Sequence, residues 1–291
     1  MPDIEYVSFL SDYGRADEFV AVCHAVMLEL APHLRVLDVT HEIPPFDVRS
    51  GSMTLVRAIQ YLPSGIVLAV VDPGVGTDRR CLAVEVEQGF LVGPDNGLLA
   101  PAVAMLGGPG RVVALTNPDY QLATPGVTFA GRDIMASAAG HLAAGVPATE
   151  LGEEVDAAGL APGLLPLFSE EDEGHLAGEV LWVDRFGNCQ LNVGPDDLAA
   201  RGMSPGDAVE VRLAVETRRA RWVRTYAEAK PSELVVLVDS YGLLALAFDR
   251  QSAASLLQLR PGGKVTLVLP GAPDALGAQE APVRLGRTEE R

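Results

Sequence analysis

The segment VLAVVDPGVGTDRR, residues 67–80, organises the interpretation of the whole chain. Its first five residues are all apolar, and Asp72, Pro73 and Gly74 follow them directly. An unbroken apolar run closed by Pro and Gly predicts a central strand of a covered sheet. Because ligands of open α/β sheets bind beyond the carboxyl ends of the strands, Asp72 stands where a site is expected.

Arg79 brings a cation back to the same loop, so that a carboxylate and a guanidinium are available together. A second interpretation is a plain turn, in which Asp72 caps the backbone and Arg79 is a solvated charge, since Asp, Pro and Gly are common turn residues. The loop by itself leaves both interpretations open.

Strands and helices alternate on the N-terminal side of this segment. Apolar spacing predicts strands over residues 6–10 and 34–39 and helices over 18–30 and 47–61. This alternation favours a parallel sheet with right-handed crossovers. Beyond residue 80 the patterns predict a hairpin over 81–92, a strand over 111–115, and helices over 98–105 and 131–144. We therefore expect an α/β N-terminal domain with a mostly parallel central sheet.

The pattern changes after about residue 156, where Pro, Gly and an acidic run predict a linker. Short strands are then predicted over residues 179–183, 208–213, 234–238, 243–248 and 264–269. Strands at this spacing favour a smaller C-terminal all-β barrel domain. The expected limits are 1–160 for the first domain, 161–177 for the linker, 178–275 for the barrel and 276–291 for a polar tail.

Composition narrows the classes of partner. The 291 residues include 39 acids and 22 bases, and the net charge of −17 argues against nucleic acid, whose phosphates need a basic face. No apolar run approaches the roughly 18 residues of a membrane span. The acidic start of the chain is unlike a signal peptide, so we expect a cytoplasmic protein without a membrane partner.

Several motifs that would indicate a cofactor or a metal are absent from the sequence. There is no dinucleotide or P-loop glycine pattern and no serine-hydrolase elbow. Cys23, Cys81 and Cys189 are far apart and in no metal-like spacing, which predicts reduced thiols. We therefore expect no cofactor and no metal.

Six blocks of sequence, taken together, resemble the S-adenosylmethionine hydroxide adenosyltransferase family, the relatives of the fluorinase and chlorinase enzymes. The blocks span nearly the whole chain and comprise residues 9–14, 38–43, 70–80, 93–97, 128–133 and 184–188. The resemblance implies a homotrimer with its sites between neighbouring subunits. It also implies that water or hydroxide attacks the ribose C5′ of S-adenosyl-L-methionine, the substrate, to give adenosine and L-methionine.

The resemblance further implies substrate-binding residues. Asp12 matches the acid that binds the ribose hydroxyls, and a carboxylate is suited to accept two hydrogen bonds from a cis-diol. Asp184 and Asn188 match the positions that hold the methionine amino acid group. Phe186 falls at a packing position beside the substrate.

The adenine is implied to meet two further segments, mainly through their backbone groups. One is the turn that contains Ser240. The other is the stretch made of Ser252, Ala253 and Ala254.

Asp72 and Arg79 match two members of the Asp, Arg and His set of the hydroxide branch. The histidine is expected between Phe129 and Gly131, where this chain has Ala130. The halogenases have a tyrosine at the position of Asp72, so Asp72 favours water over halide as the nucleophile. In this interpretation Asp72 accepts a proton from the water and Arg79 holds the carboxylate or the water.

Ala130 leaves several interpretations open. Asp72 and Arg79 suffice for catalysis, or an ordered water replaces the imidazole, or the protein binds its ligand with little turnover. The leading hypothesis is a hydrolase of S-adenosyl-L-methionine. The alternatives are a catalytically weak binding protein for this compound or adenosine, and a halide-using 5′-halo-5′-deoxyadenosine synthase. Of the five histidines, only His41 is expected near the site, as a structural loop residue.

Overall fold

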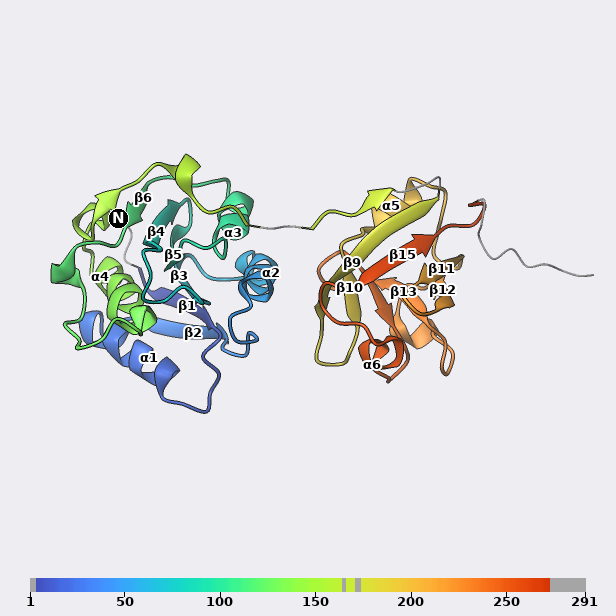
Figure 1. Ribbon diagram of the computed structural model, residues 1–291, viewed down its shortest axis with the longest axis horizontal. Helices are drawn as coiled ribbons and strands as arrows, with labels where there is room; N and C mark the ends of the chain where they lie inside the picture. Colours follow the sequence, from blue (N-terminus) through green and yellow to red (C-terminus); the bar gives the residue numbers. More distant parts are fainter. Residues whose placement is uncertain (1–3, 164–165, 171–173, 273–291) are drawn as a thin grey trace, which may run out of the picture. The chain divides into compact units, whose positions relative to one another are not determined.

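The computed structural model describes residues 4–163, 166–170 and 174–272 (Figure 1). The chain divides into two compact units, Met1–Leu165 and Pro166–Arg291. The first is an α/β unit and the second is a β-barrel, which confirms the expected fold class. Strand β8 (Ser169–Glu170) and the start of β9 (His175–Val183) lie within the segment expected to be a linker. The expected polar tail, 276–291, lies outside the described residues.

The sheet of the first unit has the strand order β2-β1-β3-β5-β4-β6-β7. Strands β2, β1, β3 and β5 are parallel neighbours, whereas β4, β6 and β7 add antiparallel pairings at the other side. The sheet is thus mixed, with its parallel part where the predicted βαβ units are. Its strands are β1 (Tyr6–Ser11), β2 (Arg35–Thr40), β3 (Gly65–Val70), β4 (Cys81–Val86), β5 (Gly89–Pro94), β6 (Val112–Ala114) and β7 (Glu153–Glu154).

Helices cover both faces of this sheet, and Figure 1 shows α1 (Phe19–Leu30) and α4 (Ser137–Ala143) on one side and α2 (Val48–Ile59) and α3 (Ala100–Met105) on the other. Successive strand residues point to opposite faces, so Phe9 belongs to the core under α1 and Leu10 to the core under α2. This double coverage explains the continuous apolar run of β3.

The helix predicted over residues 131–144 is confirmed in position, but only its second part is an α-helix. Its first part, η2 (Gly131–Ala136), is a π-helix that continues into α4. Short 3₁₀ turns connect other elements: η1 (Pro118–Tyr120), η3 (Ala148–Glu150), η4 (Ala157–Gly159) and η5 (Tyr226–Glu228).

The second unit is a barrel closed by pairing of β9 with β10. Neighbouring strands of the barrel pair antiparallel, except that β12 and β13 are parallel to each other. An apolar core fills the barrel. The other elements are β10 (Cys189–Leu191), α5 (Pro195–Ala199), β11 (Ala208–Arg212), β12 (Thr217–Trp222), β13 (Val235–Val238), β14 (Leu244–Ala247), α6 (Ala253–Leu257) and β15 (Lys264–Val268).

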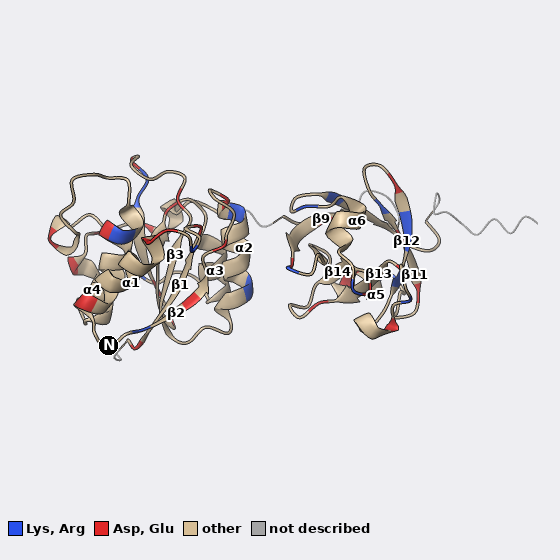
Figure 2. Ribbon diagram, turned by 90° about the horizontal axis from the view of Figure 1, so that it is seen from below, with Lys and Arg blue, Asp and Glu red and all other residues tan. Residues whose placement is uncertain are grey.

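Sequence patterns missed two of the barrel strands. Strand β10 has three residues, too few for a periodic signal. Strand β12 carries Arg218, Arg219 and Arg221, seen as blue on its ribbon in Figure 2, and its sequence resembles a surface segment. Ala220 and Trp222 are nevertheless buried in the barrel core. None of the helices in the described ranges is long and apolar enough to cross a bilayer.

Gly89 provides a test of the parallel pairing between β3 and β5, where it lies opposite Gly65. Its φ is +134°, and a Cβ there would lie 1.9 Å from the Gly65 carbonyl oxygen. We expect Gly89→Ala to reduce the free energy of unfolding by about 3 kcal/mol or more, because backbone of a central strand must move. Urea denaturation measures the loss.

Gly107→Ala is the matched control. Gly107 also has a positive φ, +93°, but a Cβ there would meet nothing within 4 Å. Only left-handed strain of about 1 kcal/mol is expected. Equal losses in the two variants would contradict the close approach at Gly89.

Candidate active site

The parallel strands bring their following loops to one edge of the sheet. Asp12 follows β1, His41 lies just beyond β2, and Asp72 lies beyond β3. The backbone N–H of Asp12 donates to the carbonyl oxygen of Val70 at 3.3 Å. The Asn96 amide, from the loop after β5, donates to the Val71 carbonyl at 2.9 Å. Polar segments far apart in sequence thus meet at the end of β3.

Asp72 and Arg79 form a two-point ion pair. Arg79 Nε donates to Asp72 Oδ1 at 2.7 Å, and Arg79 Nη2 donates to Oδ2. The side chains are 7% and 13% exposed, respectively, so this is a largely buried pair rather than a solvated turn. The turn between them passes through Gly76, whose φ of +79° is in the left-handed region that favours glycine. Both residues are therefore held in a fixed geometry.

A third group supports the guanidinium. Arg79 Nη1 donates to Cys81 Sγ at 2.7 Å. Burial disfavours the charged guanidinium, but its hydrogen bonds to Asp72 outweigh that effect and raise the pKa of Arg79 above its ordinary value. Arg79 therefore stays charged and orients both oxygens of the carboxylate.

Asp12 is held by a backbone group from a distant loop. The Phe46 N–H donates to Asp12 Oδ2 at 2.8 Å. Burial raises the pKa of Asp12, and the negative charge of Asp72 adds to that increase. The carboxylates of Asp12 and Asp72 are thus close enough to repel each other, and a cationic ligand bound between them would relieve this repulsion.

Ala130 is buried and lines a cavity of about 360 Å³ together with Arg79 and Cys81. The Cβ of a side chain at the neighbouring Gly131 would lie 1.8 Å from the Tyr13 hydroxyl oxygen. Phe129 packs edge-on against Tyr13, with ring centroids 5.6 Å apart. The segment 129–131 thus sits against the Asp12 loop, with space beside Ala130.

His41 does not line that cavity. It is fully buried, and its Nδ1 lies 2.7 Å from Ser11 Oγ. The ring packs edge-on against Phe9, with centroids 4.7 Å apart. These contacts agree with the structural role expected for His41.

The barrel unit holds a second and larger cavity of about 930 Å³. Five of the expected substrate residues line it: Asp184, Phe186, Asn188, Ser240 and Ser252. Asp184 Oδ1 accepts from the backbone N–H groups of Phe186 and Asn188, at 2.9 and 2.8 Å. Asp184 Oδ2 accepts from the Asn188 amide at 2.7 Å. The tight turn 184–188 therefore presents an oriented carboxylate and an amide at one wall.

Ala253 and Ala254 do not line the barrel cavity. The Ala253 side chain is fully buried in the barrel core, and the Ala254 N–H donates to the Gly187 carbonyl at 2.9 Å. Ser252 caps helix α6 by accepting from the Ser255 N–H at 3.1 Å. This segment braces the 184–188 turn through its backbone.

Sequence reasoning missed several residues of these two sites. Cys81 is two positions beyond Arg79 on the same chain segment, and this proximity was the available signal. Phe46 contacts Asp12 through its backbone N–H, which no side-chain pattern reveals. Tyr226 comes from η5, and its hydroxyl lies 3.3 Å from the Asn188 amide. Burial, with Asp184 as a further cause, raises the pKa of Tyr226.

Comparison with known proteins assigns the family. The N-terminal domain of SAM hydroxide adenosyltransferases matches residues 7–152, and the C-terminal domain of the same family matches residues 178–266. A Salinispora arenicola protein named (R)-S-adenosyl-L-methionine hydrolase is 46% identical over 91% of this chain and 98% of its own. A protein of Actinoplanes sp. named fluorinase is 29% identical over 90% of this chain and 96% of its own.

A solved structure agrees with these matches. The crystal structure of an uncharacterized conserved protein from Thermotoga maritima has a TM-score of 0.83 and 31% identity, and the match covers 90% of this chain and all of that one. Both domains are matched in order along the chain, and the chain therefore belongs to the SAM hydroxide adenosyltransferase family.

Proposed function

We propose that this protein hydrolyses S-adenosyl-L-methionine to adenosine and L-methionine. The observation that carries the proposal is the buried Asp72–Arg79 pair, whose Arg79 lines the cavity at Ala130. The 46% identity to the Salinispora hydrolase supports the same reaction. That relative is named for the (R) form of the substrate, so both sulfonium epimers belong in the assay.

The reaction is a displacement at C5′ of the ribose. The oxygen of water forms a bond to C5′ while the C5′–S bond breaks. The electron pair of the C5′–S bond stays on sulfur, which neutralises the sulfonium and gives methionine. One proton of the water is released, and Asp72 accepts it. Because the sulfonium is a good leaving group, the protein mainly has to hold water in line with C5′ at attack distance. Arg79 serves by fixing the orientation of the carboxylate.

Each of the remaining site residues binds a different part of the substrate. Asp12 accepts hydrogen bonds from the ribose hydroxyls. Asp184 and Asn188 hold the charged amino acid group of methionine from the 184–188 turn. The Ser240 turn and the backbone of residues 252–254 meet the adenine. No cofactor or metal takes part in this chemistry.

A homotrimer would bring these two groups of residues together between neighbouring subunits. Among the exposed large apolar side chains of the described residues, Phe46 is 72%, Val127 75% and Phe186 78% exposed. The Phe46 backbone N–H donates to Asp12, Val127 lines the cavity together with Ala130, and Phe186 belongs to the 184–188 turn. Burial of these side chains against a second copy would stabilise such an assembly.

Asp72→Asn tests the proton acceptor. The amide keeps the shape of the side chain but is a far weaker base. We expect kcat/KM for adenosine formation, followed by liquid chromatography, to fall about 100-fold or more. Glu179→Gln is the matched control, since Glu179 is similarly buried and ion-paired to Lys264 at 2.6 Å, and it has no assigned part in the reaction.

Unchanged turnover in a folded Asp72→Asn variant would remove Asp72 from the chemistry. Wild-type protein that binds the substrate in calorimetry but forms no adenosine with either epimer would identify a binding protein instead. Chloride-dependent formation of 5′-chloro-5′-deoxyadenosine would identify a halide-using synthase.

Ala130→His tests whether the missing imidazole limits the rate. The cavity beside Ala130 offers space for the ring. We expect kcat to rise roughly tenfold, with a new ionisation near the ordinary histidine pKa of about 6.5 in the pH profile. Ala130→Leu fills the same space without a polar group and should not raise kcat. A folded Ala130→His variant without any gain would indicate that Asp72 and Arg79 suffice.

Mixed assemblies test the shared site. Asp72→Asn and Asp184→Ala each disable one unit, so either variant alone should be nearly inactive. Co-expression of the two variants would form cyclic trimers of random composition. About a quarter of their subunit interfaces would combine an unmutated first unit with an unmutated second unit, so about a quarter of the wild-type activity should return. No recovery in confirmed mixed trimers would place each site within one chain. Light scattering after gel filtration measures the assembly.

A further inference from the structure

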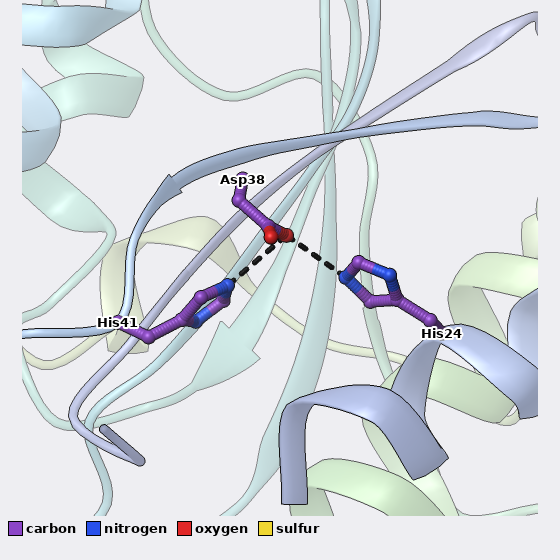
Figure 3. A group of neighbouring side chains, drawn as sticks. All are labelled: His24, Asp38 and His41. Carbon is purple, nitrogen blue, oxygen red and sulfur yellow. Dashed lines mark hydrogen bonds and ion pairs between the residues drawn. The ribbon is translucent and has the colours of Figure 1, made fainter. Parts of the chain in front are cut away.

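Two histidines and an aspartate converge behind the Asp12 loop, outside both cavities. His24 comes from α1, Asp38 from β2 and His41 from the loop after β2 (Figure 3). His24 Nε2 lies 2.8 Å and His41 Nε2 lies 3.0 Å from the same oxygen, Asp38 Oδ1. The three atoms all lie within 4.8 Å of one another.

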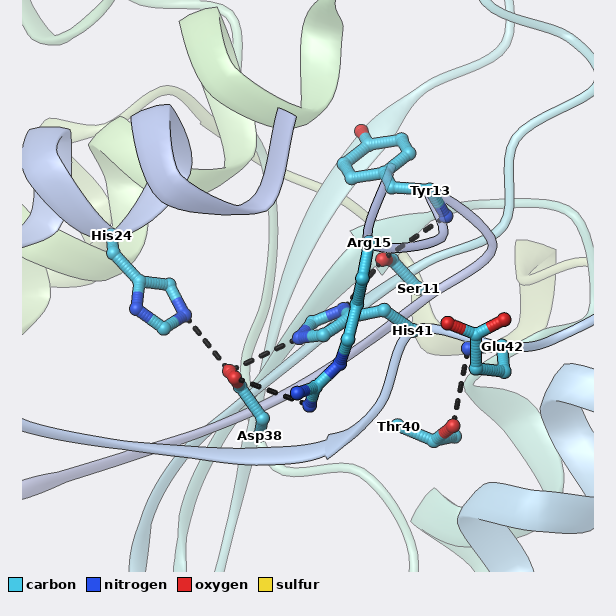
Figure 4. Close-up of polar contacts among 8 residues, drawn as sticks. All are labelled: Ser11, Tyr13, Arg15, His24, Asp38, Thr40, His41 and Glu42. Carbon is cyan, nitrogen blue, oxygen red and sulfur yellow. Dashed lines mark hydrogen bonds and ion pairs between the residues drawn. The ribbon is translucent and has the colours of Figure 1, made fainter. Parts of the chain in front are cut away.

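The two imidazoles are held in place by surrounding groups. Phe9 is fully buried and packs against both rings, with centroids 5.9 Å from His24 and 4.7 Å from His41. His41 Nδ1 is hydrogen-bonded to the buried Ser11 Oγ, and its Nε2 points toward Asp38 (Figure 4). A hydrogen bond at one ring nitrogen is the usual means of orienting the other toward a metal.

His41 Nε2 is a buried polar atom that makes no hydrogen bond to any described residue. Asp38 Oδ1 lies 3.0 Å from this nitrogen, which is an ion-pair distance. A hydrogen bond depends on the angle at the donor as well as on distance, so this contact is compatible with the lack of a well-directed hydrogen bond. A buried ring nitrogen that faces other ligand atoms without a well-directed hydrogen bond is available to a metal ion.

We propose that His24, Asp38 and His41 bind one Zn²⁺ ion. Two imidazoles and one carboxylate are suitable zinc ligands, and three protein ligands leave a fourth position for water. Bond lengths near 2.1 Å in a tetrahedral site separate the ligand atoms by about 3.4 Å. The two contacts between Asp38 and the imidazoles, 2.8 and 3.0 Å, therefore need to open by about half an ångström.

The site is accessible from solvent on one side. His24 and Asp38 are 26% and 28% exposed, whereas His41 is fully buried. Arg15 Nη2 lies 3.7 Å from Asp38 Oδ2, but its side chain is 64% exposed and free to turn into solvent when a cation binds. Asp38 then neutralises part of the charge of the ion.

Bound zinc would link three elements of the α/β unit. It would tie α1 to β2 and to the loop carrying His41, whose carbonyl oxygen accepts from the Gly14 N–H at 2.7 Å. Because Ser11 and Gly14 flank Asp12 and Tyr13, the ion would stabilise the Asp12 loop from behind. Its role is structural, and it does not depend on the proposed reaction.

Metal content tests this site directly. Full-length protein without an affinity tag is stripped with a chelator and dialysed against ZnCl₂, and we expect one zinc per chain by mass spectrometry. Zinc should also raise the thermal midpoint of the stripped protein. Cobalt in its place should give the visible absorption of a tetrahedral ion without a thiolate charge-transfer band, which excludes the cysteines as ligands.

Three variants complete the experiment. His24→Ala and Asp38→Asn each remove a partly exposed ligand, and we expect zinc affinity to fall by at least about 100-fold, since even outer-sphere changes cost 10–100-fold. His33→Ala is the matched control, because His33 is an exposed histidine of the same unit. It should keep one zinc and the full thermal shift. Wild-type zinc well below one equivalent, or undiminished affinity in His24→Ala, would overturn the proposal.

Discussion

The parallel pairing of β1 with both β2 and β3 is the constraint on which the α/β unit depends. Parallel neighbours end at the same edge of a sheet, so Asp12, His41 and Asp72 emerge together although they are far apart in sequence. The same pairing requires helices on both faces, which is why β1 and β3 are buried on both sides. The parallel pairing therefore both brings the polar loops together and creates the core that stabilises the unit.

The Asp72–Arg79 pair shows how this edge of the sheet holds two charged side chains in a fixed geometry. Burying an ion pair is costly unless the geometry is excellent and the remaining hydrogen-bonding groups are satisfied. Here the guanidinium spans both carboxylate oxygens and reaches Cys81 Sγ with its third nitrogen. A pair held in this way suits a reaction that needs one oriented base more than a mobile one. In the proposed reaction, the space beside Ala130 would leave the attacking water with fewer groups to hold it.

The predictions from sequence succeeded where the signal was local. The apolar run before Asp72 predicted a central strand, and this strand is β3. They failed where the signal was weak or distributed. Strand β12 was missed because its arginines hide an alternating pattern, and the π-helical start at Gly131 has no known sequence signature. The convergence of His24, Asp38 and His41 was also missed, since spacings of 14 and 3 residues on three different elements resemble no metal motif.

The sequence by itself determined the two-domain class and the loop that carries Asp72, because periodicity and turn residues act over short distances. The resemblance of six sequence blocks indicated the family and the loops that carry Asp12 and Asp184. Only the tertiary structure decided which of these groups touch. The two-point contact of Arg79 on Asp72, the Phe46 N–H on Asp12 and the imidazoles around Asp38 all depend on atomic positions set by packing. Hydrogen bonds and metal ligation vary steeply with distance and angle, whereas sequence patterns constrain only which face a side chain occupies.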